Sequence, residues 1–179
     1  MSVLIRNGLI VSGEKKDSPF TGDIRVSNST IEAIGKDLPP SRGDSIVDAT
    51  DCLVFPGMIQ AHVHLCQVLF RGQADDMPLL TWLKKKIWPM EAALSKDDIR
   101  LSAQLALLEM TKSGATSFFD MGTAHSTHEL LEAVAATHVR YWGGKCLMDV
   151  KAYSGPLWSS YTDNISESEE LIAHWKNRS

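Results

Sequence analysis

Two histidines one residue apart are the first feature of this sequence that could do chemistry. His62 and His64 end the segment GMIQAHVH, residues 57–64, which reads as a strand. Residues two apart on a strand point to the same face, so the two imidazoles would lie side by side and could hold one divalent ion. Neutral imidazole is a common ligand of zinc and iron. On spacing alone, two ordinary strand histidines remain the alternative.

The other polar residues give weaker signals. His125 follows a second predicted strand and is expected to be an exposed loop residue, whereas Asp120 at the end of that strand is expected to form structural hydrogen bonds. Cys66 lies two residues past His64 and could face the same way, but we expect it to serve packing. No Ser-His-Asp arrangement, phosphate-binding glycine loop or dinucleotide fingerprint is visible. The histidine pair is therefore the main candidate.

Composition narrows the class of protein. The 179 residues include 44% hydrophobic side chains, enough for a real core, and a net charge of -4, which argues against nucleic acid or an anionic membrane as a partner. Three scattered cysteines without a CxxC spacing indicate a reducing compartment. Neither a signal-peptide layout nor an apolar run of about 20 residues is present. We expect a cytoplasmic protein.

Residues 1–55 are predicted to form a small all-β domain. Its strands are expected over Val3–Val11, Asp23–Val26, Thr30–Ile34, Ser45–Ala49 and Cys52–Phe55. Asn7-Gly8 and Asn28-Ser29 are each expected to form a hairpin turn, because these residue types favour the positive φ that such turns require. No apolar stripe of helical length occurs here.

Residues 56–179 are predicted to form a second domain of alternating strands and helices. Strands are expected over Met58–Leu65, Thr116–Met121 and Tyr141–Met148, and helices over Pro78–Trp88, from Ser95 to Gly114, over Glu129–Thr137 and after an N-cap at Ser166. Pro89 is expected to end the first helix, and Ser166 with Glu169 to form a capping box at the last one. The alternation predicts parallel βα units.

Three helical stripes are predicted to face the core of this second domain. They are Leu79, Leu83 and Ile87; Leu101, Leu105 and Leu108; and Leu171, Ile172 and Trp175. Three βα units do not close a (β/α)₈ barrel, which usually takes about 250 residues. Either the domain is a small open α/β sheet, or the chain stops early within a barrel.

The string VFPGMIQAHVHL, residues 54–65, resembles the first barrel strand of the amidohydrolase superfamily. The β domain before it is similar to the sandwich that precedes the barrel in the cyclic-amidine and aminohydrolase branch. The segment LFRGQADDMPLLTWLKKKIWPMEA, residues 69–92, is similar to 5'-methylthioadenosine/S-adenosylhomocysteine deaminases and related chlorohydrolase-like enzymes. The resemblance implies an α/β fold: an N-terminal β-sandwich portion, then the first three βα units of a truncated metal-dependent TIM-barrel hydrolase.

The same resemblance implies the site residues. His62 and His64 would bind one divalent metal, Zn²⁺ or alternatively Fe²⁺, and Trp82 and Glu91 would line a nucleoside pocket. A carboxylate can accept from two vicinal ribose hydroxyls, and an indole offers a flat apolar wall. Without the resemblance, Trp82 would read as core and Glu91 as a solvated carboxylate near a helix end.

The implied activity is hydrolytic deamination of an adenosine-like nucleoside such as methylthioadenosine or S-adenosylhomocysteine. The partner is a small molecule, with a homo-oligomer of the full-length protein left open. No catalytic proton-transfer residue is identifiable in this chain, so the 179 residues alone are expected to be inactive. A guanine deaminase or s-triazine hydrolase is the alternative within the superfamily. An inactive truncated paralogue or a small binding module is the alternative of another class.

Overall fold

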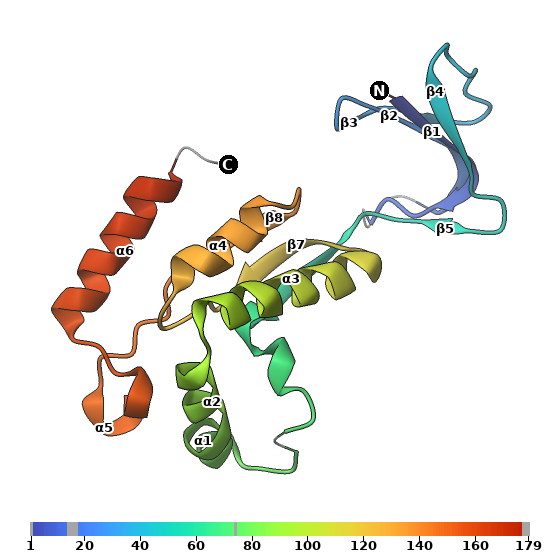
Figure 1. Ribbon diagram of the computed structural model, residues 1–179. Coiled ribbons are helices and arrows are strands. Elements are labelled where there is room, and N and C mark those ends of the chain that lie inside the picture. The colour runs from blue at the N-terminus through green and yellow to red at the C-terminus, as the bar shows by residue number, and fades with distance from the viewer. Residues whose placement is uncertain (1, 14–17, 74, 177–179) are drawn as a thin grey trace. The chain divides into compact units, whose positions relative to one another are not determined.

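The structure is a computed structural model that describes residues 2–13, 18–73 and 75–176 (Figure 1). Its internal contacts divide the chain into two units, Met1–Pro56 and Gly57–Ser179. Each unit contains one sheet, of five strands in the first and three in the second. The second unit also carries all the helices described, so the chain as a whole has a mixed α/β fold.

The first unit is a sheet built around its first strand. Its strands are β1 Ser2–Ile10, β2 Phe20–Ser27, β3 Thr30–Gly35, β4 Asp44–Asp48 and β5 Leu53–Val54. β2 pairs antiparallel with β1, whereas β4 and β5 pair parallel with it, giving the order β3-β2-β1-β4 with β5 also beside β1. Every regular element described in this unit is a strand, as predicted.

The predicted hairpin at Asn7-Gly8 is wrong, because β1 continues through this pair. The register with β2 shifts between Ile5 and Gly8, and Asn7 has a φ of 63°. Positive φ suits a β-bulge as well as a tight turn, so the Asn-Gly pair alone does not distinguish them. A Cβ on Gly8 would lie 2.5 Å from Cγ2 of Val54, so the close approach of β5 requires glycine there.

The predicted hairpin at Asn28-Ser29 is confirmed. These two residues join β2 to β3 and have φ angles of 49° and 64°, the left-handed pair of a type I′ turn. Such a turn matches the right-handed twist of the two strands it connects. Here the local signal and the tertiary structure agree.

Asp44 is expected to make the first unit sensitive to acid. Its carboxylate accepts from Ser2 Oγ at 2.5 Å and from the Ser41 N–H at 2.8 Å, and it pairs with Arg25 at 3.3 Å. The Ser2 hydrogen bond, followed by that from Ser41, lowers the pKa of Asp44 below its ordinary 3.8. A lowered folded-state pKa adds stability above the unfolded value, and this is lost as the pH falls through the folded value.

Asp44→Asn should therefore destabilise the unit at pH 7 and weaken the dependence of its unfolding free energy on pH below about 4. Urea unfolding followed at pH 7, 4 and 3 measures both effects. Glu32→Gln, on the exposed side of β3, is the matched control. An unchanged acid dependence in Asp44→Asn would contradict the assignment.

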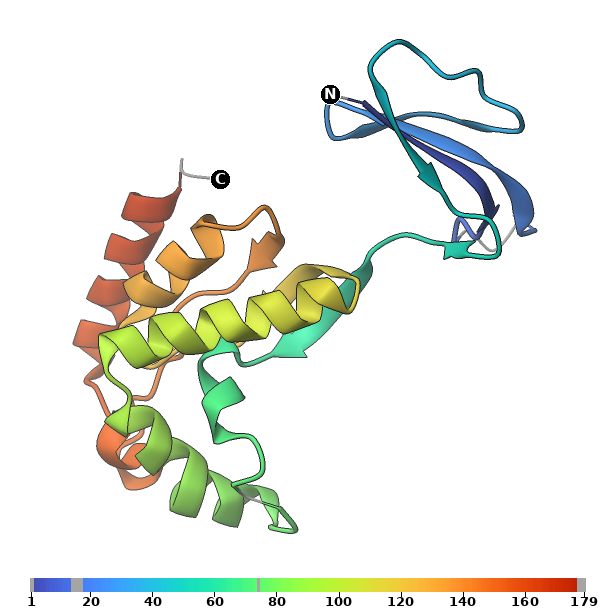
Figure 2. The same cartoon turned by 45° about the vertical axis from the view of Figure 1, so that its right-hand side comes forward.

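The second unit is a three-stranded parallel sheet with helices between the strands. Its strands are β6 Met58–Val63, β7 Ala115–Asp120 and β8 Arg140–Trp142, in the order β6-β7-β8. Its helices are α1 Leu79–Trp82, α2 Trp88–Ala93, α3 Lys96–Lys112, α4 Thr127–Ala135, α5 Lys151–Ser154 and α6 Tyr161–Trp175, with 3₁₀ helices at Leu65–Phe70 and Gly155–Leu157. Figure 2 shows α3 running alongside the sheet. The predicted alternation and parallel pairing are confirmed.

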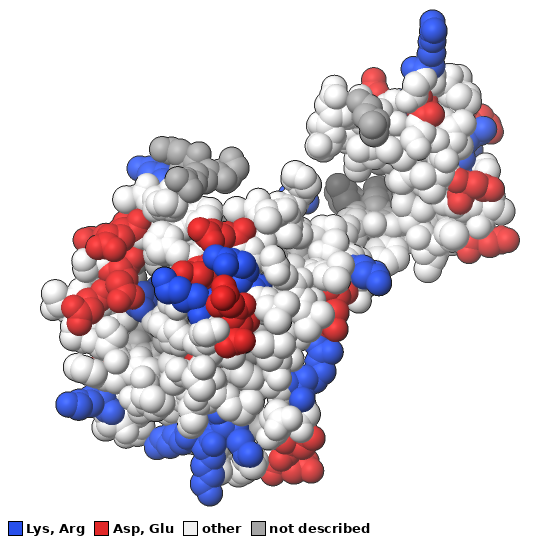
Figure 3. All heavy atoms as spheres, in the orientation of Figure 1, with Lys and Arg blue, Asp and Glu red and all other residues white. Residues whose placement is uncertain are grey.

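The core of the second unit lies between β7 and the helices α3 and α4. Phe118 of β7 is fully buried together with Ile99 and Leu107 of α3 and Leu130 of α4. Ion pairs also join the two helices, and Figure 3 shows acidic and basic side chains next to one another on the face that carries them. Because each pair has at least one strongly exposed partner, we expect apolar burial to contribute more than charge to the stability of this layer.

The other face of the same sheet exposes large apolar side chains. Phe119 of β7 is 57% exposed and is paired in register with Trp142 of β8, which is 55% exposed, and Ile59 of β6 is also exposed. Alternation along β7 places Phe118 and Phe119 on opposite faces. Only one face of the sheet is therefore covered by the described residues.

The predicted end of the first helix at Pro89 is wrong. α1 continues through a π-helical turn, Leu83–Ile87, directly into α2, which extends to Ala93. Pro89 lies in the first turn of α2, where its missing N–H costs little, and the π turn changes the hydrogen-bond spacing just before it. One helical run therefore joins Trp82 to Glu91.

The buried faces of the helices differ from the predicted stripes. Of the first stripe, Ile87 is buried but Leu79 is exposed, and on α3 both Leu101 and Leu108 are exposed. α3 instead turns its alanines and Leu107 to the sheet, because small side chains allow close packing there. A 3.6-residue period does not choose between two apolar faces.

The predicted N-cap at Ser166 is also wrong. α6 begins earlier, at an N-cap Ser160 whose hydroxyl accepts from the Asp163 N–H, so Ser166 lies inside the helix. Both serines precede an acidic residue by three positions, and the earlier pair starts the helix. Leu171 is buried as predicted, whereas Ile172 is exposed.

The predicted start of α3 at Ser95 is confirmed, whereas the third strand is shorter than predicted. Ser95 and Asp98 form a reciprocal capping box, and Gly114 follows the helix with a φ of 91°. β8 ends at Trp142 because two glycines follow and only β7 pairs with it among the described strands. None of the helices in the described ranges is both long and apolar enough to cross a membrane.

Candidate active site

The two histidines of the HxH motif lie next to each other at the carboxyl end of β6. His62 is on the strand and His64 directly follows it, with ring centroids 5.1 Å apart and ring planes at 74°. His62 is exposed and His64 is partly buried. The side-by-side arrangement expected from the spacing is present.

The surroundings of His64 favour a neutral ring. Burial lowers the pKa of His64 most, and the neighbouring His62 lowers it further, whereas the carboxylates of Asp120 and Glu91 oppose the shift. A ring that stays neutral at pH 7 keeps a nitrogen lone pair available for a metal ion. The electrostatics therefore suit ligation at this position.

Asp120 serves as a structural hydrogen-bond acceptor, as expected. Its buried carboxylate accepts from the Leu65 N–H at 3.1 Å and from the Tyr141 hydroxyl at 2.9 Å. It thereby ties the end of β7 to the segment after β6 and to β8. Burial raises the pKa of Asp120 above its ordinary value, although both hydrogen bonds oppose the shift.

Cys66 packs into the core, also as expected. It is fully buried, and its sulfur lies 4.0 Å from the Gly122 carbonyl oxygen. Burial raises the pKa of the Cys66 thiol, so the thiolate form that binds metals is disfavoured here. The two histidines therefore remain the candidate ligands on this strand end.

Glu91 is buried, so the interpretation as a solvated carboxylate is wrong. The residue is 5% exposed, and its Oε2 accepts from Gln67 Nε2 at 3.2 Å while its Oε1 accepts from the Ala124 N–H at 3.4 Å. Its charge acts on His64. A buried carboxylate near the histidine pair is typical of a binding or catalytic group rather than a surface charge.

Trp82 lies on α1 and is only partly buried, so it is not plain core. Within the described part of the chain, it makes no hydrogen bond or ring contact with the histidine pair or with Glu91. The structure therefore brings together His62, His64, Asp120 and Glu91. Trp82 lies on the same continuous helical run as Glu91, but the two side chains share none of the described hydrogen bonds or ring contacts.

His125 is not the exposed loop residue that the sequence suggested. It is partly buried, with Nε2 3.0 Å from the Glu91 carbonyl oxygen and Nδ1 3.2 Å from Ser126 Oγ. Gln67 was not a candidate at all. Gln67 and His125 lie 24 and 34 residues from Glu91 in the sequence, and both contact it in the structure. No local sequence pattern predicts contacts over such separations.

The two imidazoles could supply part of a metal site. Structural and catalytic zinc sites use three or four protein ligands, and two histidines are a common share of them. Among the residues that the structure describes, no group of three or more His, Cys, Asp or Glu side chains is arranged to hold a metal ion. The donor set fits zinc or iron but needs further ligands.

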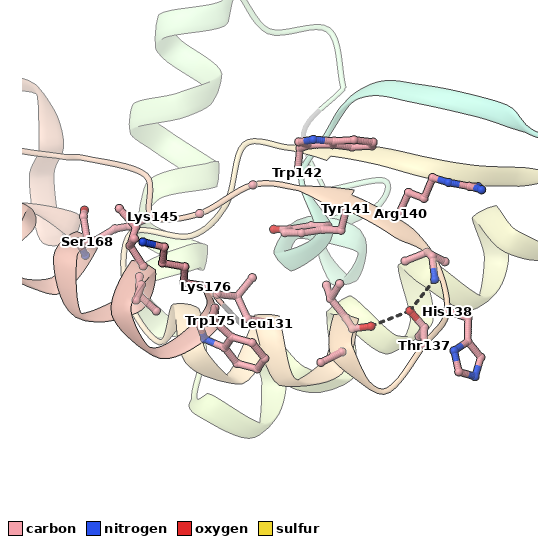
Figure 4. Close-up of a pocket in the computed structure, with 17 residues that line it drawn as sticks. Leu131, Thr137, His138, Arg140, Tyr141, Trp142, Lys145, Ser168, Trp175 and Lys176 are labelled. Atoms are coloured by element: carbon pink, nitrogen blue, oxygen red, sulfur yellow. Dashed lines mark hydrogen bonds between the residues drawn. The ribbon is translucent and has the colours of Figure 1, made fainter. Parts of the chain in front are cut away.

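A large hollow elsewhere in the second unit is separate from these residues. It has a volume of about 1170 Å³ and lies between α4, β8 and α6 (Figure 4). Mainly apolar side chains line it, including Leu131, Tyr141, Trp142, Leu171 and Trp175. Neither the histidine pair nor Glu91 borders it, so it is not the candidate site.

Comparison with known families gives one match over most of the chain. The model of the amidohydrolase family matches residues 53–178. This range begins before the histidine pair and includes all four residues that the structure brings together. It covers the entire second unit apart from its last residue.

Several curated proteins are similar to this chain. A 5'-deoxyadenosine deaminase of Methanothrix thermoacetophila is 34% identical over 97% of this chain and 37% of its own length. A 5-methylthioadenosine/S-adenosylhomocysteine deaminase of Thermococcus sibiricus is 43% identical over 68% of this chain and 28% of its own length. The chain thus spans about two-fifths or less of these relatives.

Solved structures with the same fold also extend beyond this chain. A guanine deaminase from C. acetobutylicum with bound guanine matches 100% of this chain and 44% of its own, with a TM-score of 0.85 and 25% identity. An atrazine chlorohydrolase from Arthrobacter aurescens complexed with zinc matches 97% and 43%, with a TM-score of 0.82 and 22% identity. At 22% identity, the similarity to the chlorohydrolase shows a common fold only.

Proposed function

This chain belongs to the amidohydrolase family, and on that premise we propose that it is the front part of a metal-dependent deaminase of adenosine-like nucleosides. The observation that carries the proposal is a buried carboxylate, Glu91, whose charge acts on His64 of the histidine pair. The names of the similar curated proteins, which are deaminases of adenosine derivatives, support the substrate class.

The proposal includes the domain assignment. Residues 1–55 would be the N-terminal portion of a β-sandwich, and residues 56–179 the first three βα units of a TIM barrel. The parallel order β6-β7-β8 supports this assignment. The large apolar side chains on the exposed second face of the sheet also support it, because the strands of a closed barrel are covered on both faces. The scattered free cysteines support a cytoplasmic location.

His62 and His64 would hold one divalent ion, Zn²⁺ or alternatively Fe²⁺. Such an ion lowers the pKa of water and so supplies a nucleophile at neutral pH. The overall reaction replaces the amino group of the purine by the oxygen of water and releases ammonia. In this chain, the residues contribute by binding and orienting the substrate beside the histidine pair.

Glu91 would accept hydrogen bonds from the two vicinal hydroxyls of the ribose, and Trp82 would form an apolar wall of the pocket. The position of Glu91 supports this role, because Gln67 and the Ala124 N–H hold the carboxylate oxygens in place before any substrate arrives. A preorganised acceptor loses little entropy on binding. Hydrogen bonds to a charged acceptor contribute about 1.5–3 kcal/mol.

Glu91→Ala tests the proposal in the complete reading frame. We expect kcat/KM for a nucleoside such as methylthioadenosine to fall roughly 10- to 100-fold, with little change for the free base adenine, because only the riboside contacts Glu91. Steady-state assays with both substrates measure the ratio. Glu170→Ala, on the exposed side of α6, is the control. An equal loss for riboside and base would contradict the ribose role.

A guanine deaminase or s-triazine hydrolase is the second candidate, and the similarity of the whole chain to a guanine deaminase structure supports the first of these. Such an enzyme would need no ribose contact, so free bases would be its better substrates in the same assays. An inactive truncated paralogue or a binding module is the other alternative. The DNA downstream of Ser179 distinguishes it: a stop codon supports the inert product, and a continuing frame with further His, Glu and Asp supports the enzyme.

A further inference from the structure

The loop after β7 contacts Glu91 at two separate points. His125 Nε2 lies 3.0 Å from the Glu91 carbonyl oxygen, and the Ala124 N–H points to the Glu91 carboxylate, 3.4 Å from Oε1. One contact holds the backbone of Glu91 and the other holds its side chain. Both come from neighbouring residues of a single loop.

We propose that residues 123–126 form a clamp that fixes the Glu91 carboxylate for substrate, with His125 as its positioning residue. The proposal rests on the function proposed above, in which Glu91 accepts hydrogen bonds from the ribose hydroxyls. His125 itself would touch no substrate and would act through Glu91. The clamp would therefore set the discrimination between nucleosides and free bases.

The hydrogen bonds assign the roles of the two ring nitrogens of His125. The partner of Nε2 is a carbonyl oxygen, which only accepts, so Nε2 must carry a proton. Nδ1 faces the Ser126 hydroxyl, which can donate to a neutral ring or accept from a protonated one. The contact with Glu91 thus survives in either charge state of the ring.

The backbone carbonyl group of Glu91 is available to accept a hydrogen bond from outside its helix. Glu91 lies in the short helix α2, near the end, where carbonyl groups lack partners within the helix. Its oxygen accepts from the Leu94 N–H at 3.2 Å and has a second lone pair, which His125 occupies. Without His125, the backbone of Glu91 would lose its hydrogen bond to the β7 loop, and the Ala124 contact with the Glu91 carboxylate would remain.

The loop is also held by residues that follow β8 and by a residue of α6. Lys145 follows β8, has a side chain only 2% exposed, and donates from Nζ to the Ala124 carbonyl oxygen. The same Nζ pairs with Glu167 of α6 at 2.6 Å. The Cys146 N–H also donates to the Thr123 carbonyl at 2.9 Å. The clamp is therefore held between Glu91 on one side and β8 with α6 on the other.

A clamp of this kind affects binding through geometry. Glu91 Oε1 is occupied by the Ala124 N–H, so the orientation of the carboxylate, and the reach of Oε2, depend on where the loop holds it. Small displacements of a positioned group can cost as much as about 100-fold in rate. Loss of His125 should thus resemble a weakened form of Glu91→Ala rather than a general loss of activity.

Two variants of His125 test the clamp in the complete reading frame. Glutamine places a side-chain N–H near the position of Nε2, whereas asparagine is too short to reach the Glu91 carbonyl. We expect His125→Asn to raise KM for the riboside roughly tenfold, with kcat and adenine turnover changed less than about twofold. His125→Gln should restore most of the riboside KM. His138→Asn, at an exposed histidine, is the control.

The outcomes separate this inference from the proposed function. If Glu91→Ala lowers riboside preference but His125→Asn does not, the clamp is wrong and the ribose role of Glu91 stands. If both His125 variants lower turnover of riboside and base equally, His125 has only a structural role and the clamp is overturned. If Glu91→Ala leaves the preference unchanged, both ideas fail together.

Discussion

Replacing His62 and His64 together by alanine should leave the complete protein without its metal ion and reduce deaminase activity by at least about 10³-fold. The size of the effect follows from the role of the ion, because loss of an activated water removes several kcal/mol of transition-state stabilisation. Elemental analysis by mass spectrometry, together with the assay of the same samples, measures both quantities. Wild type should carry about one zinc or iron per chain.

The chain offers a matched control for this double variant. His128 and His174 also lie side by side, with ring centroids 5.0 Å apart and ring planes at 87°. The Trp175 indole N–H donates to Nδ1 of His128, so one ring nitrogen is already engaged. His128→Ala/His174→Ala should leave metal content and activity unchanged. Equal metal loss in both double variants would mean that the assay detects histidine content and not the proposed site.

The 179-residue chain gives a sharper form of the same experiment. It should bind little metal with or without His62 and His64, because the described residues contain no third ligand next to the pair. Stoichiometric metal in this chain, lost in the double variant, would contradict that expectation. It would show that a second chain or another ligand completes the site.

Phe118→Ala should destabilise the second unit by about 3–5 kcal/mol, whereas Phe119→Ala should cost less than about 1 kcal/mol. The residues are neighbours of the same type on β7, but Phe118 is 0% exposed and Phe119 is 57% exposed. Removing the buried ring leaves a cavity between β7, α3 and α4 that the packed helices fill only in part. Denaturant unfolding of the 179-residue chain measures both free energies.

The same pair tests the proposed barrel when placed in the complete reading frame. If the rest of a barrel covers the second face of the sheet, Phe119→Ala should become costly there while Phe118→Ala stays costly. A cost of Phe119→Ala below about 1 kcal/mol in both contexts would show that this face remains open to solvent. That result would contradict the assignment of residues 56–179 as barrel units.

The sequence by itself determined the features that depend on neighbours along the chain. The spacing of His62 and His64 places both rings on one side of β6, because successive strand residues alternate. The capping box of Ser95 and the left-handed turn at Asn28-Ser29 were also predictable, since each is closed by residues within three positions. The parallel alternation of strands and helices followed from the order of local periods.

Only the tertiary structure decided features in which two local readings were equally good. Asn7-Gly8 is suited to a turn or to a bulge, and the pairing of β5 beside β1 makes it a bulge. Pro89 ends a regular helix but not one that contains a π turn. Ser160 and Ser166 are both good caps, and the residues before Ser166 already belong to α6.

The candidate site shows the same division. The HxH pair was visible in the sequence, but the burial of Glu91 and its contacts with Gln67 and His125 join segments 24 and 34 residues apart. The lysine that braces the loop, Lys145, reaches it from after β8. Such contacts depend on how the sheet brings its strand ends together, and the free energy of that packing is spread over many residues that no local pattern contains.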